Sequence, residues 1–82
     1  MTGFHYVYIL QSESSPAQIY TGVTDDLKRR LTEHNSGKVP HTTKFLPWKI
    51  RSTTAFRDEV RAFKFERYLK SGSGRSFLHR HL

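Results

Sequence analysis

Apolar and polar residues recur along the amino-terminal part of this chain with the period of β-strands. Residues 6–10 are aromatic and β-branched, and residues 19–23 repeat that character. Between them, residues 11–18 are rich in serine and contain Pro16, which predicts a turn or loop. Because this connection is short, the two strands are expected to pair as an antiparallel hairpin.

A helical pattern follows the hairpin. Thr24 and Asp25 are suitable N-cap residues, and apolar side chains recur at helical spacing from Leu27 onward. Gly37 is well suited to end this helix in a left-handed conformation. We therefore predict the first helix between the hairpin and Gly37.

The second half of the chain repeats the strand-then-helix order. Residues 38–47 are bracketed by prolines and predict a loop or a short helical turn, and residues 48–55 predict a third strand. Asp58 is expected to begin a second helix that runs to about Lys70. Gly72 and Gly74 are expected to interrupt it, with a short terminal helix over residues 76–82.

This order of elements, β-β-α-β-α-α, predicts an α+β fold in which helices flank a small three-stranded antiparallel sheet. The chain has 82 residues and shows no linker or repeat, so we expect residues 1–82 to form one domain.

The chain contains no cysteine, which excludes disulfides and thiolate zinc sites. No apolar run is long enough for a membrane span, and no secretory signal is recognisable, so we expect a cytoplasmic protein without a membrane partner.

The charge balance favours a polyanionic partner. Fourteen Lys and Arg residues face seven Asp and Glu residues, which gives a formal net charge of +7. The basic residues are spread along the chain and are not collected in a tail. Nucleic acid is the commonest partner of a folded domain of this kind.

Candidate chemistry lies on the first predicted helix. Leu27, Arg30, Leu31 and His34 form one stripe, whereas Lys28, Arg29 and Glu33 are expected to point elsewhere. An arginine on a half-buried stripe needs an anionic ligand or a partner, because an unpaired buried charge is unfavourable. The spacing leaves both this role and a simple position at the rim of the stripe open.

Two of the strand tyrosines and one helix acid are further candidates. Tyr8 and Tyr20 are either core aromatics or functional phenols, and their hydroxyls need hydrogen-bond partners if they are buried. Glu66 lies on a largely apolar stripe of the second helix, where it either binds Mg²⁺ or pairs with Lys70 four residues later. His79 and His81 are interpreted as part of a solvated tail.

Taken together, these positions resemble the GIY-YIG endonuclease superfamily over almost the whole chain, and in particular its small stand-alone bacterial members. The resemblance is carried by an ordered series of segments: Tyr6-Val7-Tyr8, Tyr20-Thr21-Gly22, residues 24–37 with an arginine four residues before a histidine, Thr42-Thr43-Lys44, Pro47-Trp48-Lys49 and residues 66–72. Two positions depart from the family motifs. Tyr6 replaces the glycine of the first motif, and Thr21 replaces the isoleucine of the second.

The resemblance implies a role for each candidate. Tyr8 would be the general base, and Tyr20 would help to activate or position the water. Arg30 would hold the scissile phosphate, and His34 would take a proton or hydrogen-bond the tyrosine. Glu66 would bind one divalent cation, Mg²⁺ or Mn²⁺.

The resulting expectation is a metal-dependent DNA endonuclease acting in DNA repair or recombination. Its candidate nucleic-acid contacts are four basic side chains: Lys28, Arg29, Lys44 and Lys70. A non-catalytic nucleic-acid-binding module and an adaptor of a repair complex remain the alternatives. No base-reading element is recognisable, so the sequence leaves the preferred substrate open, and it also leaves the oligomeric state open.

Overall fold

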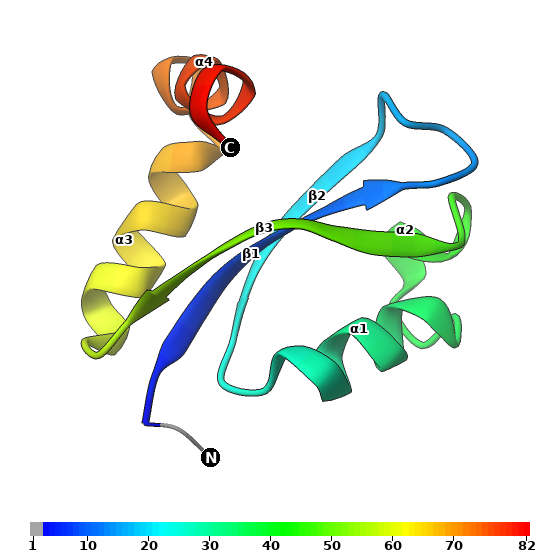
Figure 1. Cartoon of the computed structure of the whole chain (residues 1–82), viewed down its shortest axis with the longest axis horizontal. Coiled ribbons are helices and arrows are strands. Elements are labelled where there is room, and N and C mark those ends of the chain that lie inside the picture. Colours follow the sequence, from blue (N-terminus) through cyan, green and yellow to red (C-terminus); the bar gives the residue numbers. More distant parts are fainter. Residues whose placement is uncertain (1–2) are drawn as a thin grey trace.

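The computed structural model describes residues 3–82 and contains the predicted α+β fold. A three-stranded antiparallel sheet is built from β1 (His5–Ser12), β2 (Ile19–Thr24) and β3 (Trp48–Phe56), in the order β2-β1-β3. Figure 1 shows this sheet running between two helical layers, with α1 and α2 on one side and α3 and α4 on the other. The predicted order and the antiparallel hairpin are confirmed.

The central strand β1 is covered on both faces, because the residues from Val7 to Leu10 are all buried. Alternation sends successive side chains into different layers. Val7 and Ile9 pack with α3 and α4, whereas Tyr8 and Leu10 pack with Trp48 beside α1. The core is therefore split into two clusters by the sheet, and Tyr8 belongs to the cluster beneath α1.

Helix α1 (Leu27–Asn35) begins one residue later than the predicted caps. Its N-cap is Asp26, whose carboxylate accepts a hydrogen bond from the Arg29 amide at 3.0 Å. The prediction of Thr24 or Asp25 is wrong because Thr24 still belongs to β2, where its hydroxyl accepts from the Asp26 amide at 3.1 Å. Gly37 follows the helix with a φ of +81°, as predicted.

The loop before β3 contains the short helix α2 (Pro40–Thr43), which confirms the helical-turn alternative. Helix α3 (Glu59–Leu69) then follows β3. Asp58 is its N-cap and accepts a hydrogen bond from the Val60 amide at 2.9 Å. The predicted extent of this helix is confirmed.

Helix α4 (Gly72–His81) corrects the expected break after α3. Gly72 and Gly74 lie inside the first turn of α4, and Ser71 is its N-cap, with its hydroxyl accepting from the Gly74 amide at 3.1 Å. A Cβ at Gly74 would collide with the carbonyl oxygen of Tyr68 at the end of α3. The second glycine therefore permits two helices to pack closely and does not interrupt either one.

Among residues 3–82, no helix is both long and apolar enough to cross a membrane.

Candidate active site

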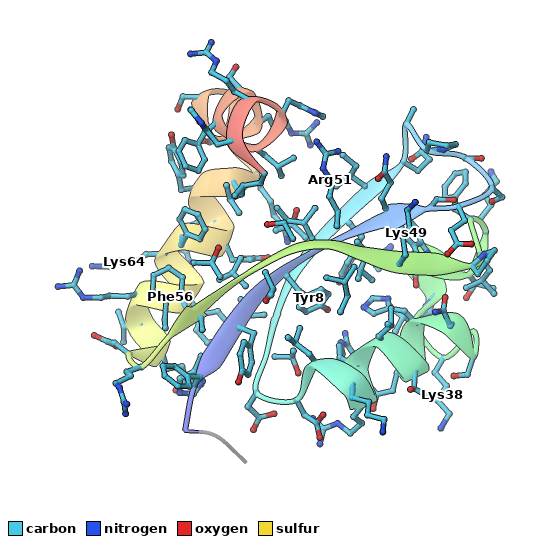
Figure 2. The ribbon with its side chains drawn as sticks, in the orientation of Figure 1. Tyr8, Lys38, Lys49, Arg51, Phe56 and Lys64 are labelled. Atoms are coloured by element: carbon cyan, nitrogen blue, oxygen red, sulfur yellow. The ribbon has the colours of Figure 1, made fainter. Side chains whose placement is uncertain are left out.

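The phenol of Tyr8 lies at the centre of a hydrogen-bonded group between the sheet and α1. Its hydroxyl oxygen is 3.0 Å from Nε2 of His34 and accepts a hydrogen bond from Nε of Arg30 at 3.2 Å. Figure 2 shows Tyr8 in this layer, on the α1 side of the sheet. The first-strand tyrosine and the arginine–histidine pair of the helix stripe are thus in direct contact.

His34 is completely buried, and its other ring nitrogen fixes its tautomer. Nδ1 lies 2.9 Å from the hydroxyl of Thr42, and that hydroxyl donates to the carbonyl of Val39 at 3.1 Å. With the Thr42 proton directed to Val39, Nδ1 carries the hydrogen and donates it. The buried Tyr8 hydroxyl needs the same arrangement, because it already accepts from Arg30 and Nε2 is the acceptor for its own proton. Nε2 of the neutral ring is then an acceptor, and Tyr8 must donate to it.

A single direction of donation therefore runs through the site. Arg30 donates to Tyr8, Tyr8 donates to His34, His34 donates to Thr42, and Thr42 donates to the backbone of Val39. Burial raises the pKa of the Tyr8 phenol, although Arg30 opposes this shift. Burial also lowers the pKa of His34, and the Arg30 charge adds to that effect. Both shifts keep the pair neutral at rest.

Arg30 has two partners within the protein. Its hydrogen bond to Tyr8 is joined by one from Nη1 to Oε1 of Glu33 at 2.9 Å, and together these raise the pKa of the guanidinium. The hydrogen bond from Arg30 holds the pKa of Glu33 below its usual range. The expectation that Glu33 points away from the stripe is therefore wrong, because the two side chains are only three residues apart on one helix. One third of the Arg30 side chain remains exposed.

Gly22 makes room for the phenol. It lies opposite Tyr8 on β2, and a Cβ built there would come within 2.5 Å of the Tyr8 hydroxyl oxygen. Real Cβ atoms do not approach this closely, so any side chain at Gly22 would displace Tyr8 from Arg30 and His34. The glycine of the segment Tyr20-Thr21-Gly22 is therefore required because no side chain fits beside the Tyr8 hydroxyl.

Tyr20 covers His34 from β2. Its ring centroid lies 4.8 Å from that of His34 and 6.3 Å from that of Tyr8. Unlike Tyr8, it is only partly buried, and it lines a hollow of about 430 Å³ at the β2 edge. The far wall of this hollow carries Lys70, Arg75 and His79 from the α3–α4 layer. His79 and His81 are exposed to solvent, as expected, but both belong to helix α4 and do not form an irregular tail, and His79 borders this hollow.

A second hollow, of about 320 Å³, lies at the other end of the same edge. It is lined by residues from β2, α1 and α3, together with His5 of β1 and Asp25 of the β2–α1 turn: Val23, Thr24, Arg29, Arg30, Glu33, Glu59 and Phe63. The first hollow contains β2 residues Ile19 to Thr21, and the second contains Val23 and Thr24. The β2 edge therefore joins the two hollows, with Tyr20 in one and Arg30 in the other.

Glu66 does not contact this hydrogen-bonded group, because α3 covers the opposite face of the sheet. Its partly buried carboxylate pairs with Lys70, as one of the two interpretations expected. Glu66 nevertheless shares a helix stripe with Phe63 and Lys70, which line the second and first hollows respectively. Glu66 therefore lies between the two hollows along α3.

A magnesium ion would find one protein carboxylate at this position. Within the described part of the chain, no three His, Asp or Glu side chains are grouped to hold a metal ion alone. Mg²⁺ usually keeps several waters and binds through one or two carboxylates together with substrate phosphates. The donor set is compatible with an ion held jointly by Glu66 and a bound substrate.

The other basic candidates are exposed, as nucleic-acid contacts must be. Lys28 lies on the exposed face of α1, Arg29 is exposed at the rim of the second hollow, and Lys44 caps the end of α2. Arg29 forms surface ion pairs with Asp25 and Glu33, at 3.4 and 3.8 Å. These side chains are spread over one helical layer, whereas Lys70 lies at the β2 edge.

Sequence reasoning missed three residues of this site. Glu33 was recognisable from its spacing to Arg30, and Thr42 stood in a segment of the family resemblance without a role of its own. No periodic pattern marks Arg75. Thr42 reaches His34 because Trp48 donates from Nε1 to the Thr42 carbonyl at 2.8 Å and thus holds α2 against the core. Arg75 depends on the close packing of α4 against α3, which is a tertiary feature.

Comparison with known proteins agrees with this arrangement. Residues 4–78 match the GIY-YIG catalytic domain. A UPF0213 protein of Streptococcus agalactiae is 41% identical over 66 residues, which cover 79% of this chain and 73% of the relative. Structure-specific endonuclease subunit SLX1 of Meyerozyma guilliermondii is 42% identical over 73 residues, covering 82% of this chain but only 25% of that protein.

The fold has a solved counterpart. The solution structure of the UPF0213 protein BH0048 from Bacillus halodurans aligns with a TM-score of 0.56 at 34% identity, covering 94% of this chain and 83% of the other. The match to the family model spans most of the chain. It includes the segments Tyr6-Val7-Tyr8 and Tyr20-Thr21-Gly22, together with Arg30, His34 and Glu66. The chain belongs to the GIY-YIG family.

Proposed function

We propose that this protein is a metal-dependent endonuclease that hydrolyses DNA phosphodiester bonds in DNA repair or recombination, in the cytoplasm. The observation that carries the proposal is the directed chain of hydrogen bonds from Arg30 through Tyr8 and His34 to Thr42. A phenol that donates to a buried, neutral imidazole has a ready acceptor for its proton. A purely structural tyrosine would need only one partner for its hydroxyl.

Arg30 is the proposed phosphate ligand. A guanidinium has five N–H donors, and the bonds to Tyr8 and Glu33 use two of them. The remaining donors suit the paired oxygens of a phosphate, which an arginine binds in bidentate fashion. Because Glu33 and Tyr8 hold the side chain in place, little of its conformational freedom is lost when the phosphate binds.

Tyr8 and His34 are the proposed base and proton acceptor. Transfer of the phenolic proton along the existing bond to Nε2 would leave an oxygen that can accept a proton from water. The resulting imidazolium would still donate from Nδ1 to Thr42. Both pKa shifts oppose this transfer in the free protein, so we expect it only when the substrate and the cation are bound.

Tyr20 is the residue proposed to position the water. Tyr8 is only 2% exposed, so an attacking water needs a second group to hold it at the surface of the site. Tyr20 is partly buried against the His34 ring and borders the first hollow, where substrate has access. Its hydroxyl can both accept and donate a hydrogen bond.

Glu66 is the proposed metal ligand, with Mg²⁺ or Mn²⁺ as the cofactor. A divalent cation bound there would supply Lewis-acid stabilisation of the leaving oxygen. Glu66 would have to exchange its contact with Lys70 for this role, and Lys70 would then be released toward a neighbouring phosphate. DNA is proposed to lie along the β2 edge, where the hollows bring Lys70 and Arg75 close to Tyr20.

The similarity to a protein named as a structure-specific endonuclease subunit supports DNA as the substrate. That relative is much longer than this chain, which covers a quarter of it. Because that relative is named as a subunit, a partner protein that directs the domain to its substrate is part of the proposal. The high positive charge supports the same class of substrate.

The test is cleavage of supercoiled plasmid and of a labelled branched duplex with Mg²⁺ or Mn²⁺. We expect wild type to cut, and we expect Glu66→Ala and Arg30→Ala each to lose about 10²–10⁴-fold in rate, as for other groups that stabilise charge at a transition state. Glu13→Ala, which removes an exposed acid from the β1–β2 loop, is the matched control and should cut normally.

The possible outcomes separate the parts of the proposal. Full activity of Glu66→Ala would reject the metal role of Glu66. Tight DNA binding by wild type without cutting under any divalent ion would reject the enzyme and favour a nucleic-acid-binding module.

A further inference from the structure

Phe63 is an aromatic side chain that the fold leaves half exposed beside the candidate phosphate ligand. It lies on the second turn of α3, and 48% of its surface remains accessible to solvent. It lines the second hollow together with Arg30 and with Glu59, one turn earlier on the same stripe. A large apolar residue in such a position is a candidate contact for a ligand with an apolar face.

The polar lining of this hollow is mixed. Arg29 and Arg30 supply positive charge, and His5 adds an imidazole. Asp25 and Glu33 are ion-paired with these arginines, whereas the Glu59 carboxylate forms no ion pair in the described structure. Carboxylates repel the phosphates of a duplex, but they accept hydrogen bonds from the amino and imino groups on base edges. A flat aromatic ring with nearby carboxylates and an arginine therefore suits a nucleobase better than a backbone phosphate.

The position of the second hollow relative to Arg30 determines which base of the DNA could enter it. Arg30 is common to the hydrogen-bonded group of Tyr8 and to the second hollow. A phosphate on the exposed side of Arg30 would therefore place a neighbouring nucleotide at the mouth of the hollow. Its base can enter only if it is not stacked and paired in a duplex.

We propose that the second hollow binds one unpaired nucleobase adjacent to the cut phosphate, with Phe63 as its stacking platform. This inference rests on the proposed function and specifies the substrate class: DNA that is single-stranded beside the scissile bond. Fully paired duplex would contact Arg30 and the basic edge but would leave Phe63 unused. Selectivity for unpaired DNA would then come from stacking and not from base sequence.

The experiment measures binding without cleavage. A labelled single-stranded oligonucleotide and its fully paired duplex are titrated with protein in EDTA, and the dissociation constants are obtained from fluorescence anisotropy. The variants are Phe63→Ala and Phe63→Trp. Val60→Ala is the matched control, because Val60 is 59% exposed on the same helix but does not line the hollow.

We expect Phe63→Ala to weaken single-strand binding by about 5-fold to 150-fold, the range for loss of one base–aromatic stack, while duplex binding changes by less than about twofold. Phe63→Trp should keep the preference for single strands, and Val60→Ala should behave like wild type. A repeat with 2-aminopurine in the single strand should show quenched fluorescence with wild type and recovery with Phe63→Ala.

Two results would overturn the base site: an equal loss for both DNAs in Phe63→Ala, or no loss for either. Cleavage is measured separately. A wild-type protein that shows the Phe63-dependent preference but cuts no DNA would support the base site and reject the proposed nuclease. A protein that cuts DNA but shows no Phe63 effect would overturn the base site alone.

Discussion

His34 is held uncharged by its surroundings, and this has a consequence for stability. Its ring is fully buried, donates to Thr42 and accepts from Tyr8, so neither nitrogen has room for a further proton. Its pKa is lowered below the ordinary 6.5 by burial and by Arg30. The unfolded chain therefore binds this proton more readily than the folded protein.

We expect the free energy of unfolding to fall as the pH drops below about 6.5, the ordinary histidine value. Above that pH the contribution is fully present, and it is lost progressively as the pH approaches the lowered pKa. Glu33, whose pKa is also lowered, affects stability only below about 4.5. Urea titrations between pH 5 and 8 measure the effect, because this range includes the ordinary pKa of histidine and stays above that of Glu33.

The matched comparison uses two histidines. His34→Gln should flatten the pH dependence, although it lowers stability at every pH. His41→Gln should keep the dependence of wild type, because His41 is exposed on α2. A profile that is flat in wild type would contradict the assignment of a buried neutral ring.

At the residue scale, sequence spacing was sufficient to bring Arg30 and His34 to one helix face, because helical geometry fixes that relation. The contact of both with Tyr8 could be expected only from the family resemblance. Thr42 lies in a segment of the family resemblance, but its contact with His34 could not be predicted, because that contact depends on how a four-residue helix packs under Trp48. Local patterns carry no information about such a contact.

Among the elements, the close turn between α3 and α4 places the tightest steric limits on its residues. Ser71 caps α4 and also donates from its hydroxyl to the Tyr68 carbonyl, so one residue satisfies a free carbonyl at the end of α3 and begins α4. Gly74 passes so close to the Tyr68 carbonyl that a methyl group has no space. Gly72, two residues earlier, faces open space.

We expect Gly74→Ala to destabilise the protein by roughly 1–3 kcal/mol, the usual range for overpacking a tight contact. Gly72→Ala should be neutral or stabilising by up to about 1 kcal/mol, because alanine favours helix and meets no neighbour. Thermal unfolding followed by far-ultraviolet circular dichroism compares the two. Similar losses in both variants would mean that the glycines serve flexibility and not close packing.

The elements themselves were largely predictable, since each carries its own local signal. The alternating strands, the proline-bracketed turn and the Asp58 cap all appear as expected. The start of α4 was misjudged because glycines normally interrupt helices, whereas here their small size serves a contact between helices. That reason is visible only when both helices are in place.

On the scale of the whole molecule, the arrangement of charge around the β2 edge would decide how the proposed DNA substrate is held. Lys70 and Arg75 line the first hollow beside Tyr20, whereas Lys64 projects from the outer side of α3, away from the sheet (Figure 2). The net charge of +7 would attract DNA over a distance from any direction. Lys70 and Arg75 are placed beside Tyr20, where they could contact a phosphate next to the candidate site.

We expect the logarithm of the DNA affinity to fall linearly with the logarithm of salt concentration. Arg75→Ala should reduce the magnitude of that slope by the amount expected for the loss of about one phosphate contact. Lys64→Ala should leave the slope unchanged, although both variants lower the net charge equally. Binding titrations at several salt concentrations with one duplex measure this. Equal slopes for the two variants would indicate attraction by net charge without a defined path.

Trp48 gives the protein an internal optical reporter for one of its two layers. It is the sole tryptophan of the chain, it is buried, and it lies in the cluster of Tyr8 and Leu10. Asn35 also bonds its backbone amide and carbonyl, which ties α1 to β3. Its emission therefore follows the side of the sheet that carries the candidate site, while circular dichroism averages over all helices. A difference between the two signals during unfolding would show that the halves on either side of β1 melt separately.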